Sequence, residues 1–207
     1  PATLGVVTVD VAEHQPRNGC VVGVKTAAGN LEAEAVIVTV HVWSLRVLES
    51  LGLRLPLKFF VHQRWVTKPL ALPLRIPLVN ANPWLGYVRP AYDGRALVGF
   101  ETTDREEFRV PSTDYQMTGL AAPAGLRATL RDHFAGLTPS LRHCQWESEK
   151  VGLLSFTMDG EPIVGPVHRL PGLFVGASFQ SGGFAYNPVV GLLLAEMVAD
   201  GKTRIDA

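Results

Sequence analysis

Cysteine is scarce in this sequence, since the 207 residues contain only two, Cys20 and Cys144. Two cysteines are too few for a disulfide framework, and their spacing matches no metal-binding motif. The histidines also lack ligand spacing, so we expect no metal site. We therefore expect the protein to reside in a reducing compartment, and we predict a cytoplasmic location.

An excess of charge of one sign is also missing, because 19 Lys and Arg residues balance 19 Asp and Glu residues. No basic run stands out, which argues against a nucleic-acid-binding surface as the main function. Charged residues make up 18% of the chain, somewhat below the usual share for a soluble globular protein. This low share fits extra buried surface, such as a cofactor cavity or a partner interface, and it fits chance equally well.

Long apolar runs are absent too. The runs Val36–Val40 and Val189–Ala195 are far shorter than the roughly 20 residues of a membrane span, so no span is expected. The N-terminal segment Pro1–Val7 has neither an initiator Met nor a charged region before a hydrophobic core, and it predicts no signal peptide. A start of this kind suggests a truncated chain, a processed subunit or a proteolytic fragment.

Composition divides the chain into three regions, which are residues 1–53, 54–146 and 147–207. The first region predicts strands at Val6–Val11 and Cys20–Thr26. The continuous β-branched run Val36–Val40 is typical of a strand in a parallel sheet that is covered on both faces. A helix is predicted over Ser44–Leu51, ended by Gly52.

The middle region is rich in proline and strand-like. Phe59–Thr67 alternates like a strand with two different faces. Gly86–Pro90 and Ala96–Phe100 predict a hairpin around the turn at Asp93-Gly94. A helix over Ala124–Leu137 places Leu126, Leu130 and Phe134 on one face.

The last region predicts a strand, a glycine loop and a helix in succession. The strand is Leu173–Ala177, the loop is Ser181–Gly183, and the helix is Val189–Ala199. Such an order brings backbone N–H groups to a bound ligand.

Short motifs follow one another along nearly the whole chain. They are Gly23-Val24-Lys25-Thr26, Gly29-Asn30-Leu31-Glu32-Ala33, Val36-Ile37-Val38, His41-Val42-Trp43-Ser44, Leu51-Gly52-Leu53-Arg54-Leu55-Pro56, Tyr87-Val88-Arg89-Pro90, Thr157-Met158-Asp159-Gly160-Glu161-Pro162-Ile163-Val164-Gly165, Phe179-Gln180-Ser181-Gly182-Gly183-Phe184 and Pro188-Val189-Val190-Gly191. Their order and separations resemble those of the D-amino-acid oxidase, sarcosine oxidase and glycine oxidase family of flavoenzymes. Each motif alone is weakly specific, but the ordered set is much more so.

The resemblance implies an α/β plus α+β fold. Residues 1–53 and 147–207 would form the closing part of a Rossmann-like FAD-binding domain, and residues 54–146 an inserted antiparallel-sheet substrate domain. The implied function is FAD-dependent oxidation, by deamination or demethylation, of an amino acid or a secondary amine. The G-x-G-x-x-G motif that would bind the FAD pyrophosphate does not occur in this sequence. The resemblance therefore places it in other sequence or on a second chain, unless the protein lacks it.

The resemblance also assigns site residues. Tyr87 and Arg89, on one face of a strand, are expected to bind the substrate carboxylate. No catalytic side chain is expected, because the cofactor supplies the chemistry. The residues expected to contact FAD are Val40, His41, Trp43, Phe179, Gln180, Ser181, Gly182, Gly183 and Phe184.

The sequence departs from the family pattern at three places. His41 and Ser181 stand where glycine is usual, and Leu154 replaces an arginine of glycine-oxidase-like members. An apolar Leu154 favours a bulkier or N-methylated substrate over glycine. Alternatives stay open: Gln180–Gly183 as a simple tight turn, and Tyr87 and Arg89 as ordinary strand residues. Two alternatives concern the whole chain. It could be a non-catalytic subunit that assembles with a flavin-carrying partner, or an unrelated α+β binding module.

Overall fold

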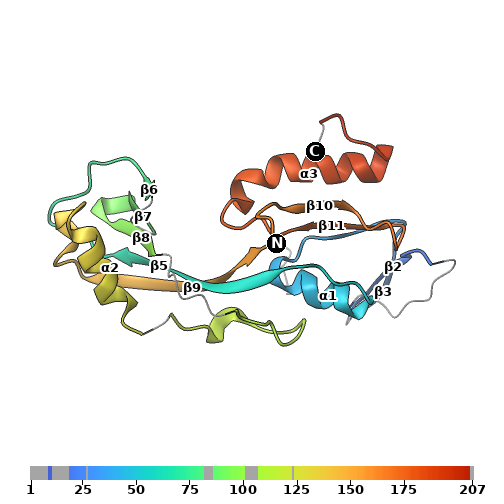
Figure 1. Ribbon diagram of the computed structural model, residues 1–207, viewed down its shortest axis with the longest axis horizontal. Helices are drawn as coiled ribbons and strands as arrows, with labels where there is room; N and C mark the ends of the chain where they lie inside the picture. Colours follow the sequence, from blue (N-terminus) through green and yellow to red (C-terminus); the bar gives the residue numbers. More distant parts are fainter. Residues whose placement is uncertain are drawn as a thin grey trace. The chain divides into compact units, whose positions relative to one another are not determined.

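The computed structural model describes residues 9–10, 19–26, 28–81, 86–100, 107–122 and 124–205. The chain divides into two compact units, whose elements are drawn in Figure 1. Unit 1 comprises Pro1–Phe59, Phe108–Tyr115 and Leu154–Ala207, and unit 2 comprises Phe60–Glu107 and Gln116–Leu153. The assignment of a cofactor domain and a substrate domain to parts of the chain remains a prediction.

A mixed three-stranded sheet, in the order β10-β11-β4, forms the centre of unit 1. β4 (Val36–Val38) runs parallel to β11 (Leu173–Ala177), and β10 (Ile163–Pro166) runs antiparallel to β11. Helix α3 (Gly183–Asp200) packs along one side of this sheet, and α1 (Ser44–Ser50) lies on the other side (Figure 1). Unit 1 therefore combines parallel and antiparallel pairing with helices on two sides.

The parallel strand predicted at Val36–Val40 is confirmed, although it ends at Val38. Val38 is buried, whereas Ile37 is 43% exposed. The expectation that both faces of this strand are covered is therefore wrong at Ile37. The helix predicted next to it is confirmed as α1, and Gly52 follows its end with a φ of 70°, a backbone conformation that glycine adopts without strain.

A second sheet of unit 1 is a small antiparallel meander. It contains β1 (Val9–Asp10), β2 (Gly23–Thr26) and β3 (Gly29–Glu32) in that order. The rest of the strand predicted at Val6–Val11 lies outside the described residues. The short 3₁₀ helices of the chain are η1 (His41–Trp43), η2 (Tyr92–Gly94), η3 (Met117–Gly119) and η4 (Pro139–Leu141).

Unit 2 is built on a five-stranded sheet in the order β6-β7-β8-β5-β9. Its strands are β5 (Lys58–Thr67, whose first two residues belong to unit 1), β6 (Val79–Ala81), β7 (Gly86–Pro90), β8 (Ala96–Phe100) and β9 (Trp146–Phe156, whose last three residues belong to unit 1). The predicted hairpin is confirmed, because β7 and β8 pair antiparallel from Gly86 opposite Phe100 to Pro90 opposite Ala96. Strand β9 was not predicted.

Helix α2 (Leu126–Ala135) covers the core of unit 2 and confirms the helix predicted there, with shorter bounds. Leu130 and Phe134 have no exposed surface and pack with Trp65. The indole Nε1 of Trp65 donates a hydrogen bond to Glu149, and this bond is the main reason why the pKa of that carboxyl lies below its usual range. Apolar packing and one anchored carboxylate therefore fix α2 and β9 against β5.

The start of α3 differs from the prediction. The helix begins at Gly183, six residues before the predicted Val189, and Pro188 lies inside it. Proline usually marks a helix start, because it has no N–H group to donate. Here the first turn forms ahead of Pro188, so the glycine loop leads directly into the helix. No helix in the described part of the chain is both long and apolar enough to cross a membrane.

Candidate functional site

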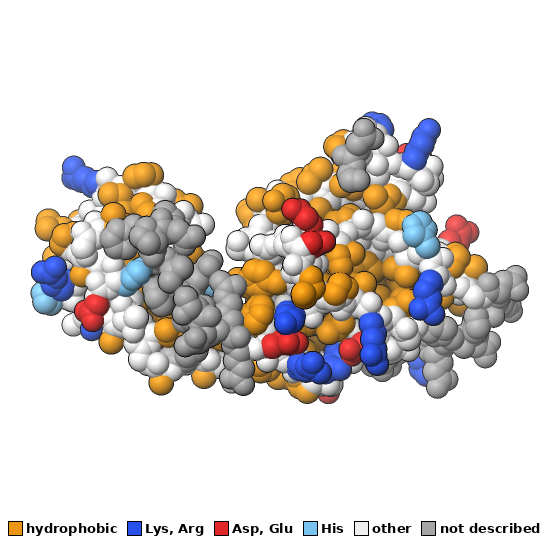
Figure 2. Space-filling view, in the orientation of Figure 1, with side chains coloured by type: hydrophobic (Ala, Val, Ile, Leu, Met, Phe, Trp, Pro, Cys, Tyr) orange, Lys and Arg blue, Asp and Glu red, His pale blue; other side chains and the backbone are white. Residues whose placement is uncertain are grey.

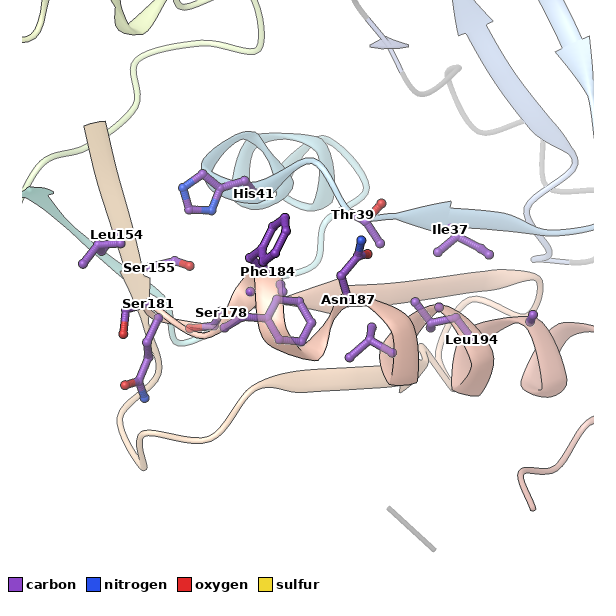
Figure 3. Close-up of a pocket in the computed structure, with 18 residues that line it drawn as sticks. Ile37, Thr39, His41, Leu154, Ser155, Ser178, Ser181, Phe184, Asn187 and Leu194 are labelled. Carbon is purple, nitrogen blue, oxygen red and sulfur yellow. The ribbon is translucent and has the colours of Figure 1, made fainter. Parts of the chain in front are cut away.

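Unit 1 contains a cavity of about 700 Å³. Its walls come from the end of β4, from η1, from the end of β9 and from the segment that links β11 to α3 and continues into that helix. Figure 3 shows Phe184 and Asn187 projecting from α3 toward Thr39 and His41, which lie across the cavity. The cavity thus lies at the carboxyl ends of the parallel strands β4 and β11, where open α/β sheets bind ligands.

The N-terminus of α3 opens onto this cavity without a cap. Its N-cap residue is Gly182, no side chain caps it, and its first turn contains no acidic residue. The first intrahelical bond runs from Tyr186 N–H to Gly182 O, so the N–H groups that precede it have no helical acceptor. The helix dipole places partial positive charge at this point. This helix end therefore offers N–H donors and partial positive charge to an electron-rich group.

The described cavity wall contains no Asp, Glu, Lys or Arg. Among the described residues there is also no cluster of His, Cys, Asp and Glu that could hold a metal ion. The lining combines apolar side chains, such as Ile37, Leu154 and Val190, with hydroxyl groups, amides and glycine. Such a wall suits a flat, neutral, hydrogen-bonding ring better than a phosphate, which would call for Arg or Lys.

Three residues of the wall have backbone conformations that L-residues rarely adopt. His41, Ser178 and Gln180 have φ values of 52°, 64° and 51°. Positive φ is costly for side chains other than glycine, and such strain clusters at functional sites. A hydrogen bond from Gln180 Nε2 to Gly160 O also stabilises the loop conformation at Gln180. The wall is therefore held in a shape that the local sequence does not favour.

Ser178 contributes an additional unusual group. Its residue surface is only 3% exposed, and its Oγ has no hydrogen-bond partner within the described structure. An unpaired hydroxyl in the interior costs free energy, because the group loses its bonds to water. The wall therefore contains a buried hydroxyl that the described structure leaves unpaired.

The structure brings most of the predicted cofactor residues to this cavity. His41, Phe179, Gln180, Ser181, Gly183 and Phe184 line it. Gly182 is the N-cap of α3, and Val40 is the residue before η1. Trp43 donates its indole N–H to Tyr115 O at 3.0 Å, so its polar atom has a structural partner. Contact of any of these residues with a cofactor remains a prediction.

Several wall residues were missed from the sequence. Asn187, Val190, Gly191 and Leu194 come from α3, and Thr39 comes from the end of β4. The positions on α3 follow the 3–4 residue spacing of one helix face, which is a readable signal. The helix predicted from Val189 includes Val190, Gly191 and Leu194, whereas Asn187 lies before its predicted start.

Apolar side chains extend beyond the cavity over the surface of unit 1. Figure 2 shows hydrophobic side chains gathered near α3. Phe184 is 96% exposed, and Tyr186, Val189 and Leu192 are also exposed. An apolar surface of this kind is typical of an interface or of a ligand-covered region.

The predicted substrate residues lie on β7 in unit 2. The ring of Tyr87 is half-buried, stacks on His62 at 6.2 Å between centroids, and occupies the space that a Cβ on Gly99 would need. Arg89 is exposed and donates from Nη1 to Pro90 O at 3.1 Å. Val88 between them is fully buried, so the two predicted residues share the opposite face of the strand. Their role in substrate binding remains a prediction.

Comparison with known proteins gives this geometry a context. The sequence profile of a family described as "FAD dependent oxidoreductase" matches residues 5–197. The chain is 30% identical to glycine oxidase from Pseudomonas aeruginosa over 188 residues, which are 90% of this chain and 47% of that protein. It is 25% identical to sarcosine oxidase subunit beta from Rhodobacter capsulatus, with 96% of this chain and 45% of that protein covered.

Solved structures share the fold. The crystal structure of L-proline dehydrogenase from P. horikoshii superposes with a TM-score of 0.79 at 22% identity, covering 95% of this chain and 50% of that one. The chain thus spans about half the length of the relatives it matches.

Proposed function

Because this chain belongs to the FAD-dependent oxidoreductase family, we propose that its protein oxidises an amino acid or a secondary amine, by deamination or demethylation. The observation that carries the proposal is the uncapped N-terminus of α3, which opens onto a cavity whose described lining contains no Asp, Glu, Lys or Arg. FAD is the cofactor of the family, and the Rossmann-like character of unit 1 belongs to the same proposal.

The wall of the cavity fits the ring system of FAD. When bound, this group would supply the hydride acceptor for a C–H bond next to the substrate nitrogen, on the α-carbon in deamination or on the N-methyl group in demethylation. The free N–H groups at the start of α3 would stabilise the negative charge that collects near the N1–C2=O edge of the reduced ring. Gly183 lets the backbone approach the ring without a Cβ, and the apolar side chains exclude water.

The substrate side of the proposal rests on unit 2 and on Leu154. Arg89 and Tyr87 would bind the substrate carboxylate, the guanidinium by a charge-assisted fork and the phenol by a single hydrogen bond. Leu154, which lines the cavity, offers an apolar contact where glycine-oxidase-like members have arginine. We therefore favour an N-methylated or bulkier amino acid over glycine as the substrate.

The visible absorption spectrum of the native-length protein tests the proposal. We expect a flavin spectrum that bleaches when one of a panel of N-methyl and free amino acids is added without oxygen. The control is a matched panel of amines that lack the carboxylate of the amino acids. These amines should bleach the flavin less. A protein that stays colourless after FAD is added would contradict the oxidoreductase function.

A second candidate function is that of a non-catalytic subunit beside a flavin-carrying partner. The bulky, positive-φ His41 in place of the usual glycine favours it. The same spectrum separates the two candidates. A subunit of this kind would be colourless alone and would copurify with a chain that carries the flavin.

The position of the Tyr87 ring gives a prediction for the substrate side. In Gly99→Ala, the new Cβ would lie 2.1 Å from Tyr87 Cζ, so the ring must move. A hydrogen bond to a charged group contributes about 1.5–3 kcal/mol, and we expect the substrate to bind about tenfold more weakly or worse. Flavin binding should not change. The measurement is the substrate concentration that gives half-maximal bleaching.

Gly152→Ala is the matched control for Gly99→Ala. It adds the same methyl group to a strand of the same sheet, where nothing lies within 4 Å of the new Cβ. Its half-maximal concentration should match that of the unaltered protein. Unchanged substrate binding in Gly99→Ala would remove Tyr87 from the substrate site.

A further inference from the structure

Ser178 is a poor choice for the stability of unit 1 on two counts. Its φ of 64° is a conformation in which a Cβ is strained, and its buried Oγ has no partner in the part of the chain that the structure describes. Glycine at this position would remove both costs, since it adopts positive φ freely and has no hydroxyl group to bury. The residue is therefore not explained by the fold of the chain alone.

The two neighbouring strained residues do not pose the same question. The Gln180 side chain donates to Gly160 O and so has a structural function, and His41 also takes part in an interaction. Ser178 is the strained wall residue whose polar atom lacks a partner in the described structure. It is the first residue after β11, in the segment that leads to the start of α3 at Gly183. Figure 3 shows it between Ser155 and Phe184 in the wall.

We propose that Ser178 Oγ donates a hydrogen bond to an acceptor atom of the flavin ring, and this inference rests on the proposed function. Ser178 lines the cavity but its Oγ is buried as it stands, so the bond requires rotation about Cα–Cβ toward the cavity. A ring carbonyl or ring nitrogen is the matching acceptor. The bond would compensate for the two costs, so Ser178 contributes to cofactor affinity at the expense of the empty protein.

The inference predicts opposite changes in two measurements on Ser178→Gly. The melting temperature of the flavin-free protein should rise, because strain and an unpaired hydroxyl are both removed. The dissociation constant for FAD, measured by quenching of flavin fluorescence, should increase about threefold to tenfold, the usual contribution of one neutral hydrogen bond. Ser178→Ala keeps the strained Cβ, so it should weaken FAD binding equally with a smaller gain in melting temperature.

Ser44→Ala is the matched control. Ser44 is another buried serine of unit 1 whose Oγ has no partner among the described residues, but it does not line the cavity. Its replacement should raise the melting temperature and leave the FAD dissociation constant unchanged. That result would show that removal of a buried hydroxyl does not by itself weaken cofactor binding.

The outcomes separate this inference from the proposed function. If the unaltered protein takes up no FAD, the proposed function fails and this inference fails with it. If the unaltered protein binds FAD and Ser178→Gly binds it with the same dissociation constant, only the inference about Ser178 is overturned. A melting temperature of the flavin-free protein that falls in Ser178→Gly would likewise overturn it, because the hydroxyl would then stabilise the fold directly.

Discussion

Replacement of Gly191 by Phe is expected to weaken FAD binding about 10- to 100-fold without loss of fold stability. Gly191 lies on α3 and lines the cavity, and a Cβ built on it meets nothing within 4 Å. The phenyl ring would thus enter open space in the folded chain and occupy room that a ligand needs. Forcing a bulky group into an occupied site costs about 1–3 kcal/mol, and each 1.4 kcal/mol is a factor of ten in affinity.

Stability should not fall in Gly191→Phe, because glycine inside a helix is unfavourable by about 1 kcal/mol relative to alanine, and phenylalanine is less unfavourable than glycine. The measurements are an FAD titration and thermal unfolding of the flavin-free protein. Gly191→Ala is the control: it should gain stability and bind FAD nearly normally, since one methyl group takes little of the cavity. A Gly191→Phe variant that binds FAD like the unaltered protein would show that the cofactor does not occupy this cavity.

Replacement of Phe134 by Ala is expected to cost about 3–5 kcal/mol of the free energy of unfolding of unit 2. Phe134 has no exposed surface and packs in the core cluster with Leu130, Trp65 and Val98. Removal of the ring forfeits its transfer free energy and leaves a cavity that the surrounding strands cannot close completely. Urea unfolding followed by tryptophan fluorescence measures the effect, because Trp65 belongs to the same cluster.

Asp132→Ala is the control on the same helix. Asp132 is exposed on α2, and its replacement should change the free energy of unfolding by less than about 0.5 kcal/mol. A loss below about 1 kcal/mol in Phe134→Ala would mean that α2 is not an integral part of the core.

Local signals in the sequence were sufficient for several elements. The helix α2 was predictable because Leu130 and Phe134 repeat at helical spacing, and the β7–β8 hairpin because Asp93-Gly94 lies between two strand-like runs. Gly52 marked the end of α1, where positive φ is required. In each case the residues that determine the element are close together in the sequence.

Strand β9 shows why other elements could not be predicted. Its first half contains Glu147 and Glu149, which suggest a solvated loop rather than a strand of a packed sheet. In the structure Glu147 pairs with Arg95 at 2.9 Å, and Glu149 accepts from Trp65 and from Arg127. These partners lie 22 to 84 residues away, and no local pattern announces them.

The candidate site could be predicted only where its residues form a local motif. The loop around Phe179 and Gly183 was found from its motif, and it lines the cavity. The sequence could not predict the positive φ of His41 and Ser178, because tertiary structure sets the φ values of non-glycine residues. It also could not predict that Ser178 Oγ has no partner in the described structure.

The free N–H groups at the start of α3 have a consequence for isotope exchange. The backbone N–H groups of Gly183, Phe184 and Ala185 precede the first helical hydrogen bond of α3. We therefore expect these amide protons to exchange rapidly with deuterium in the ligand-free protein, whereas helical hydrogen bonds protect those further along α3. A ligand that accepts these bonds slows the same few sites selectively. The exchange rates of these three amide protons therefore measure ligand binding at the cavity, even for a ligand that absorbs no visible light.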